Sequence, residues 1–182
     1  MLNITSIEDA LYNWINEVVD DSRWAIIFAH QNKPLPNKPL ILINILEIIP
    51  RGIAEPEYTL QPDDSTDIDW SNLEELFISI NVFKDMTTDP AITNLTMTTK
   101  LKDSLNRVTI TDALYASGLG YNRASEIRDI PEEINKEWES RSQFDCYFFV
   151  RSLDNENIAT IQKIEITNNI NDDGDTVIIE KP

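Results

Sequence analysis

The side chains best suited to nucleophilic and acid–base chemistry, histidine and cysteine, each occur once in the 182 residues, as His30 and Cys146. Ser-His-Asp and Cys-His mechanisms need a histidine base beside a nucleophile. His30 stands in FAHQN, which carries no nucleophile signature and is typical of a strand-end histidine bonded to backbone. Cys146 lies in FDCYFF, an aromatic setting typical of a buried, inert thiol. We therefore expect no catalytic residues and no enzyme activity.

Motifs for metals and cofactors are equally scarce. The segment NDDGD at 171–175 shares acidic residues with a calcium loop but lacks the alternating oxygen ligands and the terminal glutamate. GLG at 118–120 is better explained as a helix stop, and the chain has no Walker A, GxGxxG or HExxH pattern. One cysteine excludes an intrachain disulfide and disfavours a cysteine-based metal site. The sequence predicts neither a metal nor a cofactor.

Net charge restricts the partners. The chain has 32 acidic and 15 basic residues, a formal charge of −17. Such a surface repels nucleic-acid phosphates and anionic lipids, which argues against specific nucleic-acid binding but not against DNA passing without adhering. The longest apolar run, about 40–49, is too short to span a membrane and contains Asn44 and Glu47. We expect no membrane association and, because the N-terminus lacks the positive region and apolar core of a signal peptide, a soluble intracellular protein.

Hydrophobic spacing predicts the elements that carry these residues. A helix is expected over about 5–20, capped by Thr5 or Ser6, and two more over about 89–118. The second is expected to begin at Asp89 and Pro90; the third is capped by Thr109 or Thr111 and stopped by Gly118. Strands are predicted at 23–30, 39–49, 75–84, 137–152 and 159–167.

Two strands have one fully apolar face. In 75–84 that face holds Leu76, Ile78, Ile80 and Val82, and in 137–152 it holds mainly Trp138, Phe144, Cys146, Phe148 and Val150. Segment 54–75 has eight acids and no base, so we expect an exposed or mobile loop or ribbon. Trp14 and Trp24 are assigned to the core rather than to an interface.

The order of elements predicts an α+β fold, with a mostly antiparallel sheet covered by helices on one face and an acidic loop at about 54–75. We expect a single domain over residues 1–170. Residues 171–182 are polar and then apolar, and are expected to form a C-terminal tail or arm.

An ordered set of segments resembles the neck or tail terminator proteins of tailed bacteriophages. The set runs from about Ile4 to Asn168 and comprises LYNWI, AHQNKPLPNKPLILINI, FISINVF, TTKLKDSLNR, ALYASGLGY, EWESRSQFDCYFFV and IATIQKIEITN. The resemblance implies the λ-type tail terminator fold, a sheet flanked by helices that assembles as a ring, commonly a hexamer.

The same resemblance implies a structural virion protein at the neck, assembled in the host cytoplasm. Its ring would cap the tail tube and join it to head-completion or connector proteins, and to sheath-related proteins in a contractile tail, with DNA passing through an acidic lumen. A head-to-tail connector, stopper or tail-completion protein stays open as an alternative. An acidic binding module is a further alternative, for which the sequence shows no convergent polar cluster.

Four residues are candidate interface positions. Pro34, Pro36 and Pro39 stiffen the segment between two strands, and we expect them to shape one edge of the subunit for a ring or tube contact. An ordinary surface turn is the alternative. Arg141 begins an aromatic strand in a chain short of bases, and is expected to pair either with the acidic loop of a neighbouring subunit or with an acid of its own chain.

Overall fold

The computed structural model describes residues 2–30, 34, 36–61, 65–84, 93–134, 137–159, 163–167 and 176–180. The chain divides into two compact units. The sheet unit comprises Met1–Ile53 and Asn72–Ser152, and the ribbon unit comprises Ala54–Ser71 and Leu153–Pro182. The expectation of one domain over 1–170 with an arm at 171–182 stays a prediction.

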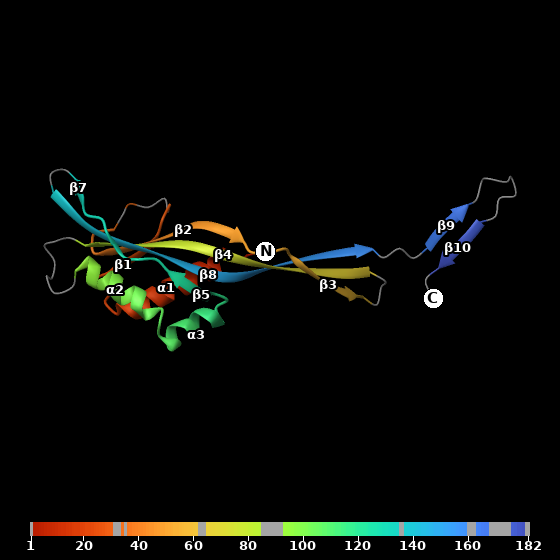
Figure 1. Ribbon diagram of the computed structural model, residues 1–182, viewed down its shortest axis with the longest axis horizontal. Helices are drawn as coiled ribbons and strands as arrows, with labels where there is room; N and C mark the ends of the chain where they lie inside the picture. The colour runs from red at the N-terminus through yellow and green to blue at the C-terminus, as the bar shows by residue number, and fades with distance from the viewer. Residues whose placement is uncertain are drawn as a thin grey trace. The chain divides into compact units, whose positions relative to one another are not determined.

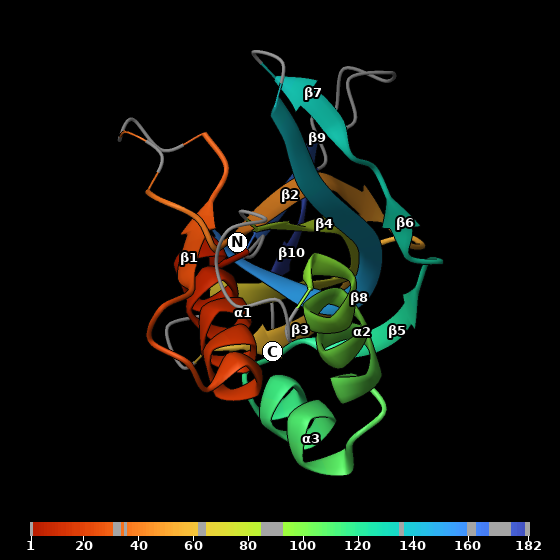
Figure 2. The same cartoon turned by 90° about the vertical axis from the view of Figure 1, so that its left-hand side faces the viewer.

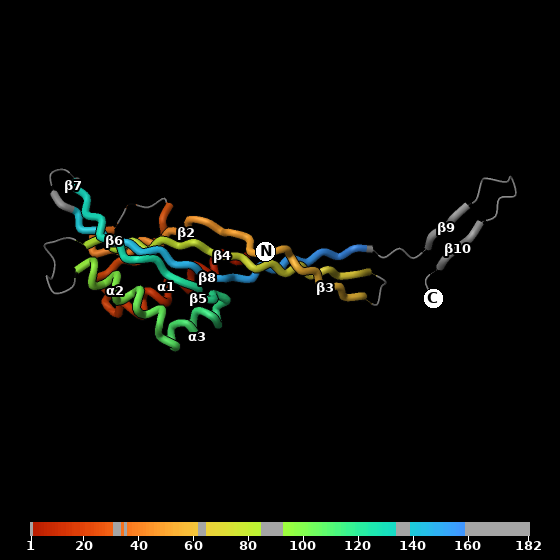
Figure 3. Tube along the Cα trace, in the orientation of Figure 1, coloured from red at the N-terminus to blue at the C-terminus, as the bar shows by residue number. Residues whose placement is uncertain are grey.

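An eight-stranded sheet organises the chain, in the order β1–β2–β4–β8–β5, with β3 beside β4 and with β6 and β7 beside β8 (Figures 1 and 3). The strands are β1 (Ala25–Phe28), β2 (Leu40–Pro50), β3 (Glu55–Leu60), β4 (Ser65–Lys84), β5 (Gly120–Ala124), β6 (Arg128–Asp129), β7 (Glu132–Ile134) and β8 (Glu137–Ala159). Strand β1 is parallel to β2, whereas β2–β4, β3–β4, β5–β8, β6–β8 and β7–β8 are antiparallel. The predicted α+β fold with a mostly antiparallel sheet is confirmed.

The segment with Pro34, Pro36 and Pro39, called the proline segment below, lies in sequence between the parallel strands β1 and β2. Ala25 pairs with Leu40, and the Ala25 N–H donates to the Pro39 carbonyl at 3.1 Å. Adjacent parallel strands cannot be joined by a tight hairpin, because the chain must first return along the length of the strand. The chain therefore needs a connecting segment between Phe28 and Leu40, which explains why the two apolar runs are separated along the sequence.

Three helices cover one face of the sheet (Figure 2): α1 (Ile4–Val19), α2 (Asn94–Ser104) and α3 (Val108–Ala116). None of the helices in the described ranges is long and apolar enough to cross a membrane. The expected helix ends need correction. The side chain of Asn3, not Thr5 or Ser6, caps α1 by accepting from the Ser6 N–H at 3.1 Å.

The other two helices also begin differently from expectation. Helix α2 begins at Asn94 with Thr93 as its cap, and Asp89 and Pro90 lie outside the described residues. Helix α3 has Arg107 at its N-cap position without a side-chain bond, so Thr109 and Thr111 lie inside the helix. Side chains with similar capping ability compete at a helix start, so the sequence signal is ambiguous there by a few residues. Gly118, with a φ of 86°, ends α3 as predicted.

The core lies between the helices and the facing side of the sheet. The predicted apolar face of β4 is confirmed, since Leu76, Ile78, Ile80 and Val82 are all fully buried. The opposing helices contribute Leu11, Trp14, Ile15, Leu101 and Leu114, and β8 contributes Phe144, Cys146, Phe148 and Val150. Trp14 packs edge-on against Phe148, with ring centroids 6.2 Å apart, and Trp24 is also buried, so both tryptophans belong to the core as predicted.

The ribbon unit contains β3, the first part of β4, the end of β8, and the strands β9 (Lys163–Thr167) and β10 (Thr176–Glu180). The acidic segment predicted as a loop or ribbon is therefore a β-ribbon, in which Glu55–Leu60 pairs with Thr66–Ser71. Strands β9 and β10 form an antiparallel pair of their own. The predicted strand at 159–167 is thus confirmed at 163–167, while the docking of the C-terminal arm stays a prediction.

Candidate interaction surface

Alternation along β4 and β8 places a second set of side chains on the face turned away from the helices. We call this surface the open face; it consists of the odd-numbered residues 75–83 of β4 and 139–147 of β8, with their neighbours on adjacent strands. The two strands meet there through Phe77 and Tyr147, whose rings stack at 4.8 Å. Unlike the core side, the open face is built from polar and aromatic groups along β4 and β8, with aliphatic neighbours such as Leu42 and Ile49 on β2.

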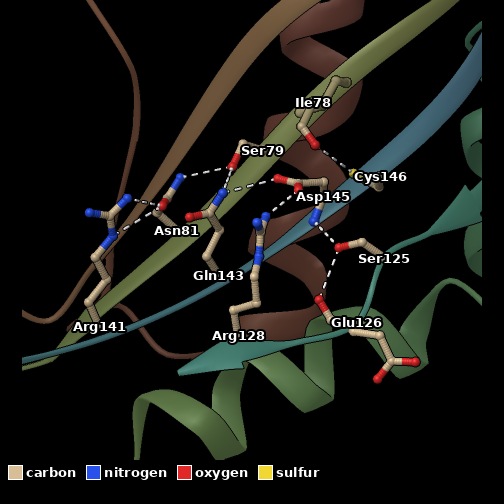
Figure 4. A network of polar contacts seen from close by, with 10 residues as sticks. All are labelled: Ile78, Ser79, Asn81, Ser125, Glu126, Arg128, Arg141, Gln143, Asp145 and Cys146. Atoms are coloured by element: carbon tan, nitrogen blue, oxygen red, sulfur yellow. Dashed lines mark hydrogen bonds and ion pairs between the residues drawn. The ribbon is translucent and has the colours of Figure 1, made fainter. Parts of the chain in front are cut away.

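A continuous polar network runs along the open face (Figure 4). Arg141 donates to Asn81 Oδ1 at 2.7 Å, and Asn81 donates to Ser79 Oγ at 3.3 Å. Gln143 then donates both to Ser79 Oγ at 2.7 Å and to Asp145 Oδ1 at 3.1 Å. Ser79, Asn81 and Asp145 are buried, and such burial is tolerated because each finds a partner. The network therefore holds Arg141 in one defined orientation.

Arg141 was expected to pair with a carboxylate, either of its own chain or of another subunit. Within the part of the chain that the structure describes, its partners are the amide of Asn81 and the ring of Phe83, 5.3 Å from the guanidinium carbon. Neither partner neutralises the charge, and the side chain is half-buried. The intersubunit role of Arg141 stays a prediction.

Glu75 is the most enclosed charged group of the open face. Its carboxylate accepts from Arg51 Nε at 3.0 Å, from Asn122 Nδ2 at 2.8 Å and from Arg123 Nη1 at 3.0 Å. The hydrogen bond from Arg51 is the main cause that holds the pKa of Glu75 below its usual value. Burial opposes this effect, while the hydrogen bond from Asn122 and the charges of Arg123 and Arg51 lower the pKa further. The expectation that all acids of 54–75 are exposed is wrong here, because Glu75 is only 1% exposed.

Three arginines present their charge at this surface. Arg51 and Arg123 cover Glu75, and Arg128 forms an ion pair with Asp145. The side chains of these three arginines remain 47%, 54% and 51% exposed, while both carboxylates lie beneath them. The open face therefore presents guanidinium groups to solvent in a chain whose net charge is −17.

Two further contacts complete the charge pattern. Arg123 lies over the Tyr147 ring at 3.9 Å from its centroid, which fixes the guanidinium on the sheet. On β2, Glu47 is exposed and is the cross-strand partner of Phe77, so this acid shares the face with the arginines, as do Glu75, Glu139 and Asp145. Sequence reasoning singled out Arg141 but missed Arg51, Arg123 and Arg128. None of these three lies on β4 or β8; the available signal was the polar alternate positions of those strands, which include the partners Glu75 and Asp145.

The proline segment adjoins one corner of the open face. Leu40, which follows Pro39, is the cross-strand partner of Phe83, the ring that Arg141 contacts. Lys38 forms an ion pair with Glu139, two residues from Arg141. The structure thus brings Pro39 and Arg141 to the same corner. Pro34 is exposed and Pro36 is half-buried, and neither is among the partners of Arg141 in the described residues.

The residues considered for catalysis lie apart. The side chain of His30 is exposed at the end of β1, at a φ of 64°. Cys146 is fully buried, and its thiol donates to the Ile78 carbonyl at 3.6 Å. Burial, with a smaller contribution from Asp145, raises the pKa of that thiol, as expected of an inert cysteine.

The described ranges contain no group of three or more His, Cys, Asp or Glu residues arranged to hold a metal ion. The NDDGD segment at 171–175 lies outside the described residues. A groove of about 190 Å³ lies between α1 and α3, with Trp14, Ile110 and Leu114 in its wall and Glu17 as its one carboxylate. The open face has more polar and charged side chains in contact with one another than this groove has.

Comparison with known proteins was made on the whole chain. A family model described as phage neck terminator protein matches residues 5–174, which confirms the resemblance drawn from the ordered segments. No curated protein matches the chain.

Proposed function

The chain belongs to the family of phage neck terminator proteins, and from this premise we propose that it forms a ring that caps the tail tube and joins it to the head-completion or connector proteins. Family membership over residues 5–174 is the observation that carries the proposal. The family is structural, and a neck protein is part of the virion. Assembly takes place in the host cytoplasm before the particle is complete.

A ring requires subunits that present two unlike surfaces, because a head-to-tail contact that closes on itself generates cyclic symmetry. The chain offers a polar sheet face rich in arginine and, on other residues, a strongly acidic ribbon. A hexamer is the proposed stoichiometry. The neighbours above and below the ring are the connector proteins, the tail tube protein and, in a contractile tail, sheath-related proteins.

DNA would pass through the ring without being held by its wall. With 32 acids against 15 bases, the protein repels phosphates, and an acidic lumen lowers friction on a moving polyanion. Sequence-specific DNA recognition would require clustered cations facing the DNA. In this proposal the exposed arginines serve contacts between proteins instead.

The corner formed by the proline segment and Arg141 is the proposed contact with a neighbouring subunit or with the tube. Pro34, Pro36 and Pro39 restrict the chain before docking, so little conformational entropy is lost on binding. The ion pair of Lys38 with Glu139 ties this segment to the sheet and fixes its position relative to Arg141.

Gold-labelled antibody against the protein, applied to intact tailed particles and viewed by negative-stain electron microscopy, tests the proposal. Label confined to the head–tail junction supports it. Absence of label on particles opened at that junction, with no band for the protein in purified virions, would contradict it. Pull-downs with tube protein and with portal-side proteins then separate a terminator, which binds the tube, from a head-to-tail connector, stopper or tail-completion protein.

A further inference from the structure

We infer that the acidic face of the ribbon unit in one copy docks on the arginine-lined open face of the next copy. This inference rests on the proposed ring and names the surfaces through which its subunits meet. The proposed intersubunit role of Arg141 then becomes part of a contact between two complementary surfaces.

The first surface is one side of the ribbon. In the β3–β4 pairing Glu55 faces Ser71, Glu57 faces Asp69, and Thr59 faces Asp67. Residues that face each other across two strands lie on the same side, so four carboxylates share this side. We call it the acidic face. The alternate positions, which include Tyr58, Leu60 and Ile68, occupy the other side.

The segments that carry the acidic face and the amides in contact with it contain no cation, and the lysines of the ribbon unit, Lys163 and Lys181, lie further along the chain. Neither 54–71 nor 153–158 contains a lysine or an arginine. Asp69 accepts from the Asn155 amide at 2.7 Å, and Asp67 accepts from the Asn157 amide at 2.5 Å. These amides orient the carboxylates without neutralising them.

Glu57 and Asp69 lie directly opposite each other, and like charges in that relation destabilise a strand pair. The ribbon therefore keeps a repulsion that its own described side chains do not relieve. A cationic partner from outside the ribbon would relieve it.

The open face has the required chemistry. Arg51, Arg123 and Arg128 each use part of their guanidinium group on a carboxylate of the sheet and remain about half exposed, which leaves N–H groups free for a second acceptor. The planar guanidinium fork matches a carboxylate in geometry as well as in charge. Arg141 adds a fourth cation held by Asn81.

Two unlike surfaces that complement each other make a head-to-tail contact, and such a contact closes into a ring or extends as a filament. A contact between two copies of the same face would instead bring arginine to arginine or acid to acid. Charge complementarity thus selects a second copy of this chain as the occupant, in the orientation that a ring requires.

The test uses two charge-reversed forms of the full chain. The face variant carries Arg123→Glu and Arg141→Glu, which leaves Arg51 on Glu75 and Arg128 on Asp145. The ribbon variant carries Glu55→Lys and Glu57→Lys, both at exposed positions. The matched control carries Asp154→Lys and Glu156→Lys, the same charge change at positions of β8 that alternate with Asn155 and Asn157.

Self-association is measured by sedimentation velocity at low salt over a concentration series. We expect the wild-type protein and the control to associate, more weakly as salt is added. Each reversed variant alone should associate at least roughly tenfold more weakly, because like charges then meet at the contact. An equimolar mixture should recover association, since the glutamates of one variant meet the lysines of the other.

Three outcomes overturn the inference: a wild-type protein that stays monomeric at the highest concentration, a reversed variant that associates like wild type, or a mixture that does not recover. A mixture that does not recover is also the result expected if the ribbon pairs with the open face of its own chain, because mixing two variants cannot restore a contact within one chain. Circular dichroism and thermal unfolding check folding, and Arg123→Gln with Arg141→Gln replaces the face variant if that variant does not fold. Gold label at the neck together with a mixture that fails to recover would retain the proposed function and reject this contact alone.

Discussion

The carboxylate of Glu75 in β4 accepts a hydrogen bond from Arg123 Nη1 in β5 at 3.0 Å, across 48 residues of sequence. Arg51 from the end of β2 binds the other oxygen of the same carboxylate. Glu75 therefore joins three parts of the sheet unit that are separate along the chain. Arg51 and Arg123 are themselves about half exposed. The carboxylate is therefore covered by their side chains but lies close to the protein surface.

Replacing Glu75 with glutamine is expected to lower the free energy of unfolding by about 1–3 kcal/mol at pH 7, between the cost of breaking a surface ion pair and that of breaking a buried one. The native pKa of Glu75 lies below its ordinary value of 4.5. Its contribution is thus complete above about pH 4.5 and is lost as pH falls through the native pKa. Urea unfolding from pH 7 to pH 3 should show the wild-type and Glu75→Gln stabilities converging.

Glu74→Gln is the matched control, because Glu74 accepts from the Ser152 hydroxyl at 2.8 Å and pairs with no arginine of the described ranges. Its effect should be smaller than that of Glu75→Gln at neutral pH. A Glu75→Gln difference that stays constant down to pH 3 would show that the charge of Glu75 does not contribute.

Helices α1 and α2 are joined by a buried hydrogen bond from Trp14 Nε1 to Ser104 Oγ at 2.9 Å. Ser104→Ala leaves the indole N–H without this acceptor, and we expect a loss of about 1–3 kcal/mol in the free energy of unfolding. Ser117→Ala is the control, since that exposed hydroxyl bonds only the Ala113 carbonyl of its own helix. Urea unfolding should place the control within about 0.5 kcal/mol of wild type. Equal effects of the two substitutions would argue against the Trp14 bond as the cause.

Cys146 should be unreactive in the folded protein. Its thiol is fully buried, and burial raises its pKa, so little thiolate forms and reagents have no access to it. At pH 8 we expect no reaction with Ellman's reagent over hours, and one equivalent in guanidinium chloride. Thr109→Cys, at an exposed site on α3, provides a reactive reference. Reaction of native wild type at the rate of that reference would contradict the buried assignment.

The proposed role of the proline segment is tested by replacing Pro34, Pro36 and Pro39 with alanine together. We expect fewer heads joined to tails when only the variant is supplied. Without the prolines, the segment loses more conformational entropy on docking than the wild-type segment does. Electron microscopy counts the joined particles, and circular dichroism checks that the variant is folded. Pro131→Ala, at another exposed proline, should join normally. If the triple variant joins heads to tails normally, residues 29–39 only connect two strands and the proposed contact is rejected.

Local periodicity was enough to predict much of the fold. The apolar alternation of Leu76 to Val82 identified a strand and its buried side, and the spacing of Ile7, Leu11 and Trp14 identified α1. Both signals depend on residues within a few positions of one another. Helix starts were less certain, as at Asn3, because neighbouring polar side chains compete for the same N–H groups.

Contacts between distant segments were beyond such reasoning. An acidic run at 54–75 indicates exposure by composition, yet Glu75 is covered by Arg51 and Arg123, 24 and 48 residues away. The parallel pairing of β1 with β2 was likewise not apparent from two apolar runs. Of the candidate positions, Arg141 was identified as unusual, but its neighbours Arg123 and Arg128 were not.

Sequence patterns alone were sufficient for the type and position of most elements, the buried side of two strands, the acidic character of the chain and its membership of the neck terminator family. These properties follow from residue type and short-range spacing. Only the tertiary structure decided which strands are neighbours and which polar groups meet on the open face. Those pairings depend on the path of the backbone between distant residues, and hydrophobic periodicity carries no information about that path.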